Sequence, residues 1–138
     1  MDLDRREFLV ACAACALSWN AAGCAAVNPV PLVEADAEGR VSVAGRLDKP
    51  GDQIKVNLPD SPDLVLVWAG AKGFGAASIT CTHRGSQVHF NPAEGTLDCP
   101  SHGSRFDENG QVLHGPANRP LVPYRVQVDD GLLRVRRA

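Results

Sequence analysis

Two short segments each carry a cysteine and a histidine, and these four side chains are the best candidates in the chain for holding a metal centre. The first segment reads Cys81-Thr82-His83, and the second, after 15 intervening residues, reads Cys99-Pro100-Ser101-His102. Thiolates and imidazoles are the ligands of zinc sites and of iron–sulfur clusters. The other three of the five cysteines lie before residue 25. The pattern therefore predicts one centre built from two mixed loops.

Three kinds of site use these residue types. A tetrahedral zinc site accepts two cysteines and two histidines, but zinc fingers normally place both cysteines on one element and both histidines on another. A binuclear iron–sulfur cluster explains the mixed loops, because one iron can take two thiolates and the other two imidazoles. A disulfide between Cys81 and Cys99 suits an exported protein but leaves both histidines without a purpose. The residues favour the cluster, and zinc and the disulfide stay as alternatives.

The length and charge of the chain limit what can surround such a centre. A chain of 138 residues suits one domain. Its 14 basic and 16 acidic residues give a net charge of -2, so no broad basic surface is expected and nucleic acid is not an expected partner. Only 5% of the residues are aromatic, whereas 13 are glycine and 10 are proline. This composition favours short strands joined by turns over a helical bundle.

Short runs rich in Val, Ile and Leu alternate with clusters of Gly, Pro, Asp and Asn, and these runs predict β-strands. They cover residues 40–43, 53–58, 64–68, 76–80, 95–97, 111–113, 125–128 and 132–135. Asp129-Asp130-Gly131 predicts a hairpin between the last two. We therefore expect an all-β domain with several small sheets. Its basic end, 134–137, is expected to be a solvated edge strand, with docking of an acidic partner as the alternative.

The N-terminal segment has the features of an export signal. Arg5 and Arg6 precede Phe8, and no charged residue follows until after Val33. Residues 1–24 resemble a twin-arginine (Tat) signal, whose receptor exports proteins that have already folded. As an export signal, the segment could be cleaved off, be lipidated at Cys24 or stay attached as a membrane anchor. The alternative is that it is an ordinary N-terminal helix and no signal. We expect a linker over 25–36 and the domain over 37–138.

From residue 37 onward the chain resembles the Rieske [2Fe-2S] family, and the matching motifs cover most of the domain. They are Cys81-Thr82-His83-Arg84-Gly85, Cys99-Pro100-Ser101-His102-Gly103-Ser104-Arg105-Phe106-Asp107, and Gly115-Pro116-Ala117 ahead of Pro120-Leu121. The resemblance implies the all-β Rieske fold, which is an antiparallel β base with an inserted small cluster-binding subdomain. It also implies one [2Fe-2S] cluster, with Cys81 and Cys99 on the buried iron and His83 and His102 on the iron nearest solvent.

Several positions depart from parts of the family. Rieske subunits of cytochrome bc complexes generally have a disulfide between cysteines where this chain has Ser86 and Ser101. Ser104 keeps a hydroxyl that the family uses to tune the cluster, but Phe106 replaces a tyrosine that supplies a second one. Arg84 is more typical of ring-hydroxylating oxygenases and their ferredoxins. The chain therefore combines features of the respiratory and oxygenase branches.

Other candidate residues are expected to have ordinary roles. His89 and His114 have no cysteine at ligand spacing, so we expect them at the surface or in hydrogen bonds, and Trp68 in the core. No residue is assigned a catalytic role. The cofactor-binding residues are Cys81, His83, Cys99, His102 and Ser104.

The function implied by the resemblance is one-electron transfer at the periplasmic face. The chain would act as a carrier or as the small subunit of a membrane-associated oxidoreductase, with a cytochrome or a larger oxidoreductase subunit as its partner. One alternative is a quinol-oxidising Rieske subunit of a cytochrome bc-type complex, against which the missing tyrosine and disulfide count. Another is a Rieske ferredoxin feeding an oxygenase, which the export signal disfavours because those systems draw electrons from cytoplasmic NAD(P)H.

Overall fold

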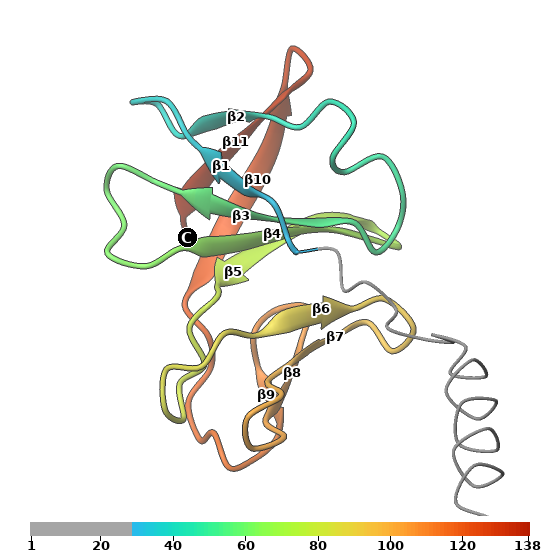
Figure 1. Cartoon of the computed structure of the whole chain (residues 1–138), viewed down its shortest axis with the longest axis vertical. Helices are drawn as coiled ribbons and strands as arrows, with labels where there is room; N and C mark the ends of the chain where they lie inside the picture. The colour runs from blue at the N-terminus through green and yellow to red at the C-terminus, as the bar shows by residue number, and fades with distance from the viewer. Residues whose placement is uncertain (1–28) are drawn as a thin grey trace, which may run out of the picture.

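The computed structural model describes residues 29–138, which form two β-sheets and no helix (Figure 1). Accordingly, no helix in this part of the chain could cross a membrane. The export signal expected over residues 1–24 lies outside the described residues. The strands are β1 (Leu32–Glu34), β2 (Arg40–Ser42), β3 (Gln53–Asn57), β4 (Val65–Gly70), β5 (Gly73–Ser78), β6 (His89–Asn91), β7 (Thr96–Asp98), β8 (Arg105–Asp107), β9 (Val112–His114), β10 (Pro123–Asp129) and β11 (Leu132–Arg137).

Seven strands form the larger sheet, in the order β1-β3-β4-β5-β10-β11-β2. Its pairs are antiparallel except β1 with β3, so most of the sheet is built from hairpins and returning strands. Alternation along β3 and β11 directs one row of apolar side chains inward, whereas β4 is buried on both faces. The core of this base sheet includes Val41, Ile54, Val56, Val65, Val67, Leu133 and Val135.

The smaller sheet, β6-β7-β8-β9, lies between β5 and β10 in the sequence and below the base sheet in Figure 1. The Trp68 ring of β4 stacks on the Phe90 ring of β6 with centroids 5.5 Å apart, which joins the two sheets through one apolar cluster. Gly75 opposes Trp68 on β5, and a Cβ there would overlap the indole. The expected all-β base with an inserted subdomain is confirmed, and Trp68 lies in the core as expected.

All eight predicted runs overlap observed strands, but three strands were not predicted. β6 and β8 are three residues long and have one buried apolar residue each, Phe90 and Phe106, so their sequences carry no apolar run. β1 falls inside the expected linker 25–36 and pairs with β3. The edge-strand expectation for 134–137 is partly right: β11 lies between β10 and β2, but β2 pairs with it only as far as Arg134, and Arg136 and Arg137 are exposed beyond that pairing. Edge position depends on long-range pairing, which the local sequence does not encode.

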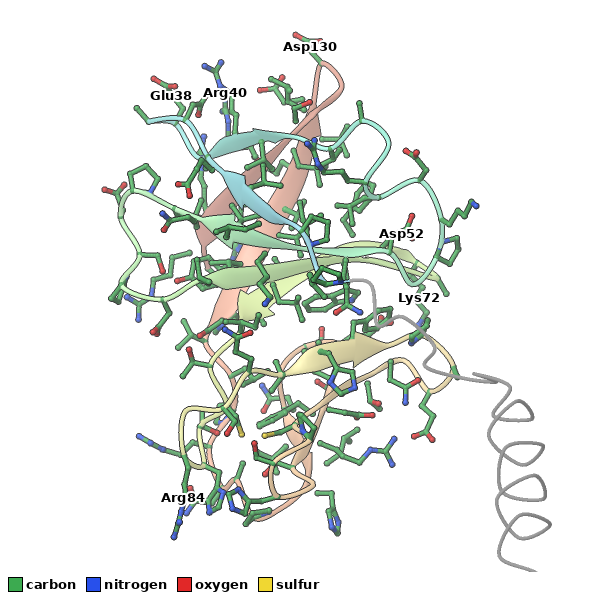
Figure 2. The ribbon with its side chains drawn as sticks, in the orientation of Figure 1. Glu38, Arg40, Asp52, Lys72, Arg84 and Asp130 are labelled. Carbon is green, nitrogen blue, oxygen red and sulfur yellow. The ribbon has the colours of Figure 1, made fainter. Side chains whose placement is uncertain are left out.

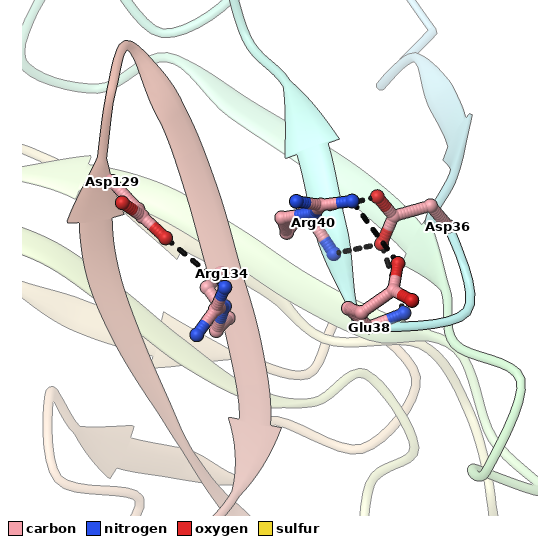
Figure 3. Close-up of polar contacts among 5 residues, drawn as sticks. All are labelled: Asp36, Glu38, Arg40, Asp129 and Arg134. Carbon is pink, nitrogen blue, oxygen red and sulfur yellow. Dashed lines mark hydrogen bonds and ion pairs between the residues drawn. The ribbon is translucent and has the colours of Figure 1, made fainter.

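The charged surface beside β2 is organised by Asp36 (Figure 3). Its carboxylate accepts bonds from the backbone N–H groups of Glu38 and Arg40, at 3.0 and 2.8 Å, and pairs with the Arg40 guanidinium at 2.7 Å. Arg40 also pairs with Glu38, and on β11 Arg134 pairs with Asp129. The backbone N–H of Arg40, together with its side chain, lowers the pKa of Asp36 below 3.8. The ionised carboxylate thus holds the turn that leads into β2.

We expect Asp36→Asn to destabilise the protein at pH 7 and to have little effect in acid. Because the folded-state pKa is depressed, the carboxylate stabilises the fold above its unfolded value near 3.8, and this contribution disappears as the pH falls through the folded-state pKa. Denaturant midpoints of the wild type and variant at pH 7 and pH 3 measure the difference. Asp60→Asn, at an exposed carboxylate, is the control. A destabilisation that is the same at both pH values would contradict this role.

Candidate metal centre

The two loops that carry the cysteines and histidines have the same backbone design. In the first loop the N–H of Cys81 donates to the carbonyl of Ser86, and the N–H of Gly85 donates back to the carbonyl of Cys81, at 2.8 and 2.9 Å. In the second loop the N–H groups of Cys99 and Gly103 make the matching bonds, at 2.8 and 3.0 Å, to the carbonyls of Ser104 and Cys99. Each glycine has a positive φ, near 80°, which suits a residue without a Cβ.

The loops bring like ligands together. Both cysteines are free thiols and are buried, with exposures of 2% and 3%, in the apolar cluster that contains Trp68. The two imidazoles lie further out, His83 half-buried and His102 exposed, with ring centroids 4.9 Å apart and planes nearly perpendicular. Although each loop contributes a mixed pair, the site in space consists of an inner thiol pair and an outer imidazole pair.

The environment of the thiols suits a bound cation. Burial is the main cause that raises the pKa of the Cys99 thiol, and the neighbouring Cys81 thiol raises it further. Backbone N–H groups of Ser101 and His102 act the other way and favour the thiolate. Iron would supply the positive charge that a buried pair of thiolates needs.

The imidazoles fit the same centre. The Nδ1 atom of His83 is buried and has no hydrogen-bond partner among residues 29–138. Buried polar atoms are rarely left unpaired, and a nitrogen in this state suits a metal ligand. The four side chains do not converge on a single ion, since no three of the described His, Cys, Asp and Glu side chains meet at one point. A binuclear [2Fe-2S] cluster fits two separate pairs, one of sulfur and one of nitrogen.

Ser104 connects the second loop to the segment that begins at Gly115-Pro116. Its side chain is fully buried, and its hydroxyl oxygen accepts a 3.0 Å bond from the N–H of Ala117. The hydroxyl proton is therefore free to donate to another group. The sequence predicted a hydroxyl donor here, and the structure adds that the same residue holds the Gly-Pro-Ala segment against the loop.

Ser86 and Ser101 connect the two ligand loops directly. The hydroxyl of Ser101 donates to that of Ser86 at 2.7 Å. The sequence identified both positions only as missing cysteines. A hydrogen bond between these loops was not predicted, because two serines 15 residues apart give no signal of contact.

The remaining candidates lie outside the ligand loops. His89 and His114 are exposed on β6 and β9, as expected of surface histidines. Phe106 is fully buried on β8, where it pairs with Leu97 of β7. Its ring thus fills the small sheet's core and supplies no hydroxyl.

A third loop, which contains Gly115-Pro116-Ala117 and Arg119, lies at the same end of the molecule as the two loops that carry the cysteines and histidines. The Thr82 hydroxyl donates to the carbonyl of Arg119 at 2.7 Å, which joins the first ligand loop to the segment after Ala117. Arg84 lies at this end, opposite the hairpin tip at Asp130 (Figure 2). Three loops therefore enclose the thiols and leave the imidazoles toward solvent.

Comparison with known proteins gives a consistent family. A family model described as the Rieske [2Fe-2S] domain matches residues 39–126. The cytochrome b6-f complex iron-sulfur subunit 2 of Trichormus variabilis is 35% identical over 114 residues, covering 72% of this chain and 64% of that protein. The chloroplastic subunit 1 of Nicotiana tabacum is 45% identical over 72 residues, covering 52% and 32%. The chain spans less than two thirds of the length of these relatives.

Solved structures show the same likeness. The cyanobacterial plasma membrane Rieske protein PetC3 from Synechocystis PCC 6803 is 37% identical, with a TM-score of 0.54, covering 61% of this chain and 85% of that one. The ferredoxin of carbazole 1,9a-dioxygenase from Nocardioides aromaticivorans IC177 is 26% identical, with a TM-score of 0.57, covering 65% and 88%.

The bond between Ser86 and Ser101 can be measured with a double-mutant cycle. Either single change to alanine should lower the free energy of unfolding by about 0.5–1.5 kcal/mol, and the double variant should lose little more, because one bond is removed in every case. Denaturant unfolding followed by circular dichroism measures this. Ser42→Ala, at an exposed position on β2, is the control. Additive losses would show that the two hydroxyls act independently.

Proposed function

The chain belongs to the Rieske [2Fe-2S] domain family, and we propose that its activity is one-electron transfer through a cluster held by Cys81, Cys99, His83 and His102. The observation that carries the proposal is the sorting of the ligands into a buried thiol pair and an outer imidazole pair. When bound, the cluster takes up or releases one electron. Burial of the two cysteines excludes water from the thiolates, and the outer histidines give a partner its shortest approach to the centre.

We propose that the chain acts as an electron carrier or as the small subunit of a membrane-associated oxidoreductase, with a cytochrome or a larger subunit as its partner. Likeness to the ferredoxin of a dioxygenase supports the electron carrier. The second candidate is a quinol-oxidising subunit, which the likeness to cytochrome b6-f iron-sulfur subunits favours. The buried phenyl ring of Phe106 and the serines at 86 and 101 count against it.

We also propose Tat export to the periplasm or to the periplasmic face of the membrane, on the basis of Arg5, Arg6 and the apolar segment that follows. Replacing both arginines by lysine keeps the charge but removes the pair that the receptor reads. We expect cluster-loaded protein to accumulate in the cytoplasm, measured by fractionation of the expressing cells. Undiminished export would exclude this route.

The ligand assignment predicts which variants lose the cluster. Cys99→Ala and His102→Ala should abolish the roughly two irons and two acid-labile sulfides expected per domain, because each removes a ligand of one iron. Metal analysis and electron paramagnetic resonance of anaerobically purified protein measure this. His89→Ala and His114→Ala are matched controls and should keep the cluster. Stoichiometric zinc without labile sulfide would overturn the proposal.

Ser104→Ala should lower both the reduction potential and the stability. A hydroxyl bonded to a cluster sulfur favours the more electron-rich reduced state, so its loss should lower the potential by roughly 20–65 mV for a net bond of about 0.5–1.5 kcal/mol. Stability should fall as well, by about 1–3 kcal/mol, because the N–H of Ala117 loses its acceptor. A redox titration and a denaturation curve separate the two effects. Lost stability at an unchanged potential would mean that Ser104 only joins the loops.

A further inference from the structure

A groove of about 670 Å³ lies beside His83, and two arginines line it. Arg84 comes from the first ligand loop and Arg119 from the third, and both are exposed. The bond from Thr82 to the carbonyl of Arg119 fixes these two loops against each other. The two arginines are therefore presented together, on the side of the molecule where a histidine leads to the thiol pair.

The positive charge of this rim is not neutralised within the described part of the chain. Arg40, Arg105 and Arg134 form ion pairs, whereas the other arginines among residues 29–138, including Arg46 and Arg125, form none. Arg84 and Arg119 form none with residues 29–138. The chain as a whole has a net charge of -2, so the local charge does not follow from an excess of basic residues.

One acidic residue, Asp63, also lines the groove. Its backbone N–H bonds the hydroxyl of Ser61, and its carboxylate forms no ion pair within residues 29–138. The two guanidinium groups and the one carboxylate leave the rim with a net positive charge. Charge of one sign around a binding surface speeds the approach of an oppositely charged partner and orients it on contact.

We propose that Arg84 and Arg119 form a docking rim that selects a redox partner with an acidic surface around its own electron-transfer site. The inference rests on the proposed function, because it names the class of partner that exchanges electrons at His83. An acidic partner would place carboxylates on the two guanidinium groups, which can bind them with two parallel hydrogen bonds each. An uncharged quinol would not use this charge.

Small outer-sphere oxidants test the sign of the rim without a known partner. The reduced holoprotein is mixed with hexacyanoferrate(III), a trivalent anion, or with tris(phenanthroline)cobalt(III), a trivalent cation, in a stopped-flow instrument. Each reaction moves one electron from the reduced protein to the metal complex, giving iron(II) or cobalt(II). The rate with the anion should fall as salt is added, whereas the rate with the cation should not fall.

Variants locate the charge. Arg84→Ala and Arg119→Ala should each slow the reaction with the anion by roughly three- to tenfold at low ionic strength, and the difference should vanish in high salt. Arg84→Lys keeps the charge and should keep most of the rate. Asp63→Asn should speed the same reaction. Lys72→Ala removes one positive charge from the β4–β5 turn, well away from Arg84 in Figure 2, and should change little.

The outcomes separate this inference from the proposed function. Equal rates for wild type and both arginine variants, or an equal loss in Lys72→Ala, would overturn the docking rim while electron transfer itself stands. A protein that holds no cluster, or whose cluster reacts with neither oxidant, would overturn the proposed function first. Electron paramagnetic resonance of each variant confirms that the cluster is intact before rates are compared.

Discussion

Two thiols buried side by side in an apolar core are the constraint on which the rest of this structure depends. Burial disfavours the thiolate form, as the raised pKa of Cys99 shows, so the site is stable as a metal centre only if other groups supply compensating charge. Backbone N–H groups of the tight second loop do part of this, and iron would do the remainder. The matched loop geometry therefore serves to aim backbone dipoles as well as to present ligands.

The base sheet makes this geometry rigid. Trp68 belongs to the base and stacks on Phe90 of the small sheet, within the same apolar cluster that contains both cysteines. Any shift of the small sheet relative to the base would thus disturb the packing around the sulfur atoms. A rigid site suits electron transfer, because a centre that keeps its shape on gaining or losing an electron reorganises little.

The sequence predicted the parts of this design that depend on residue type and local spacing, and missed those that depend on contact at long range. The Cys and His motifs, the turn glycines and the apolar runs are local signals, and in the structure the two cysteines neighbour each other and the two histidines neighbour each other. β6 and β8 exist because β7 pairs with both, although neither has an apolar run of its own. The Ser101–Ser86 and Ala117–Ser104 bonds join segments 15 and 13 residues apart. Polar residues in loops give no indication of such partners.

The bond between Ser86 and Ser101 also bears on where the domain can fold. A disulfide between two loops needs an oxidising compartment, whereas a hydrogen bond between hydroxyl groups forms in a reducing one as well. Under the proposed Tat route the domain folds around its cluster in the cytoplasm before export, where thiols stay reduced. In this chain the ligand loops are linked by the hydrogen bond between Ser101 and Ser86, and Thr82 is bonded to the third loop. Both links can form in the reducing cytoplasm. Because neither link uses a cysteine, both are compatible with a domain that folds in the cytoplasm before it is exported.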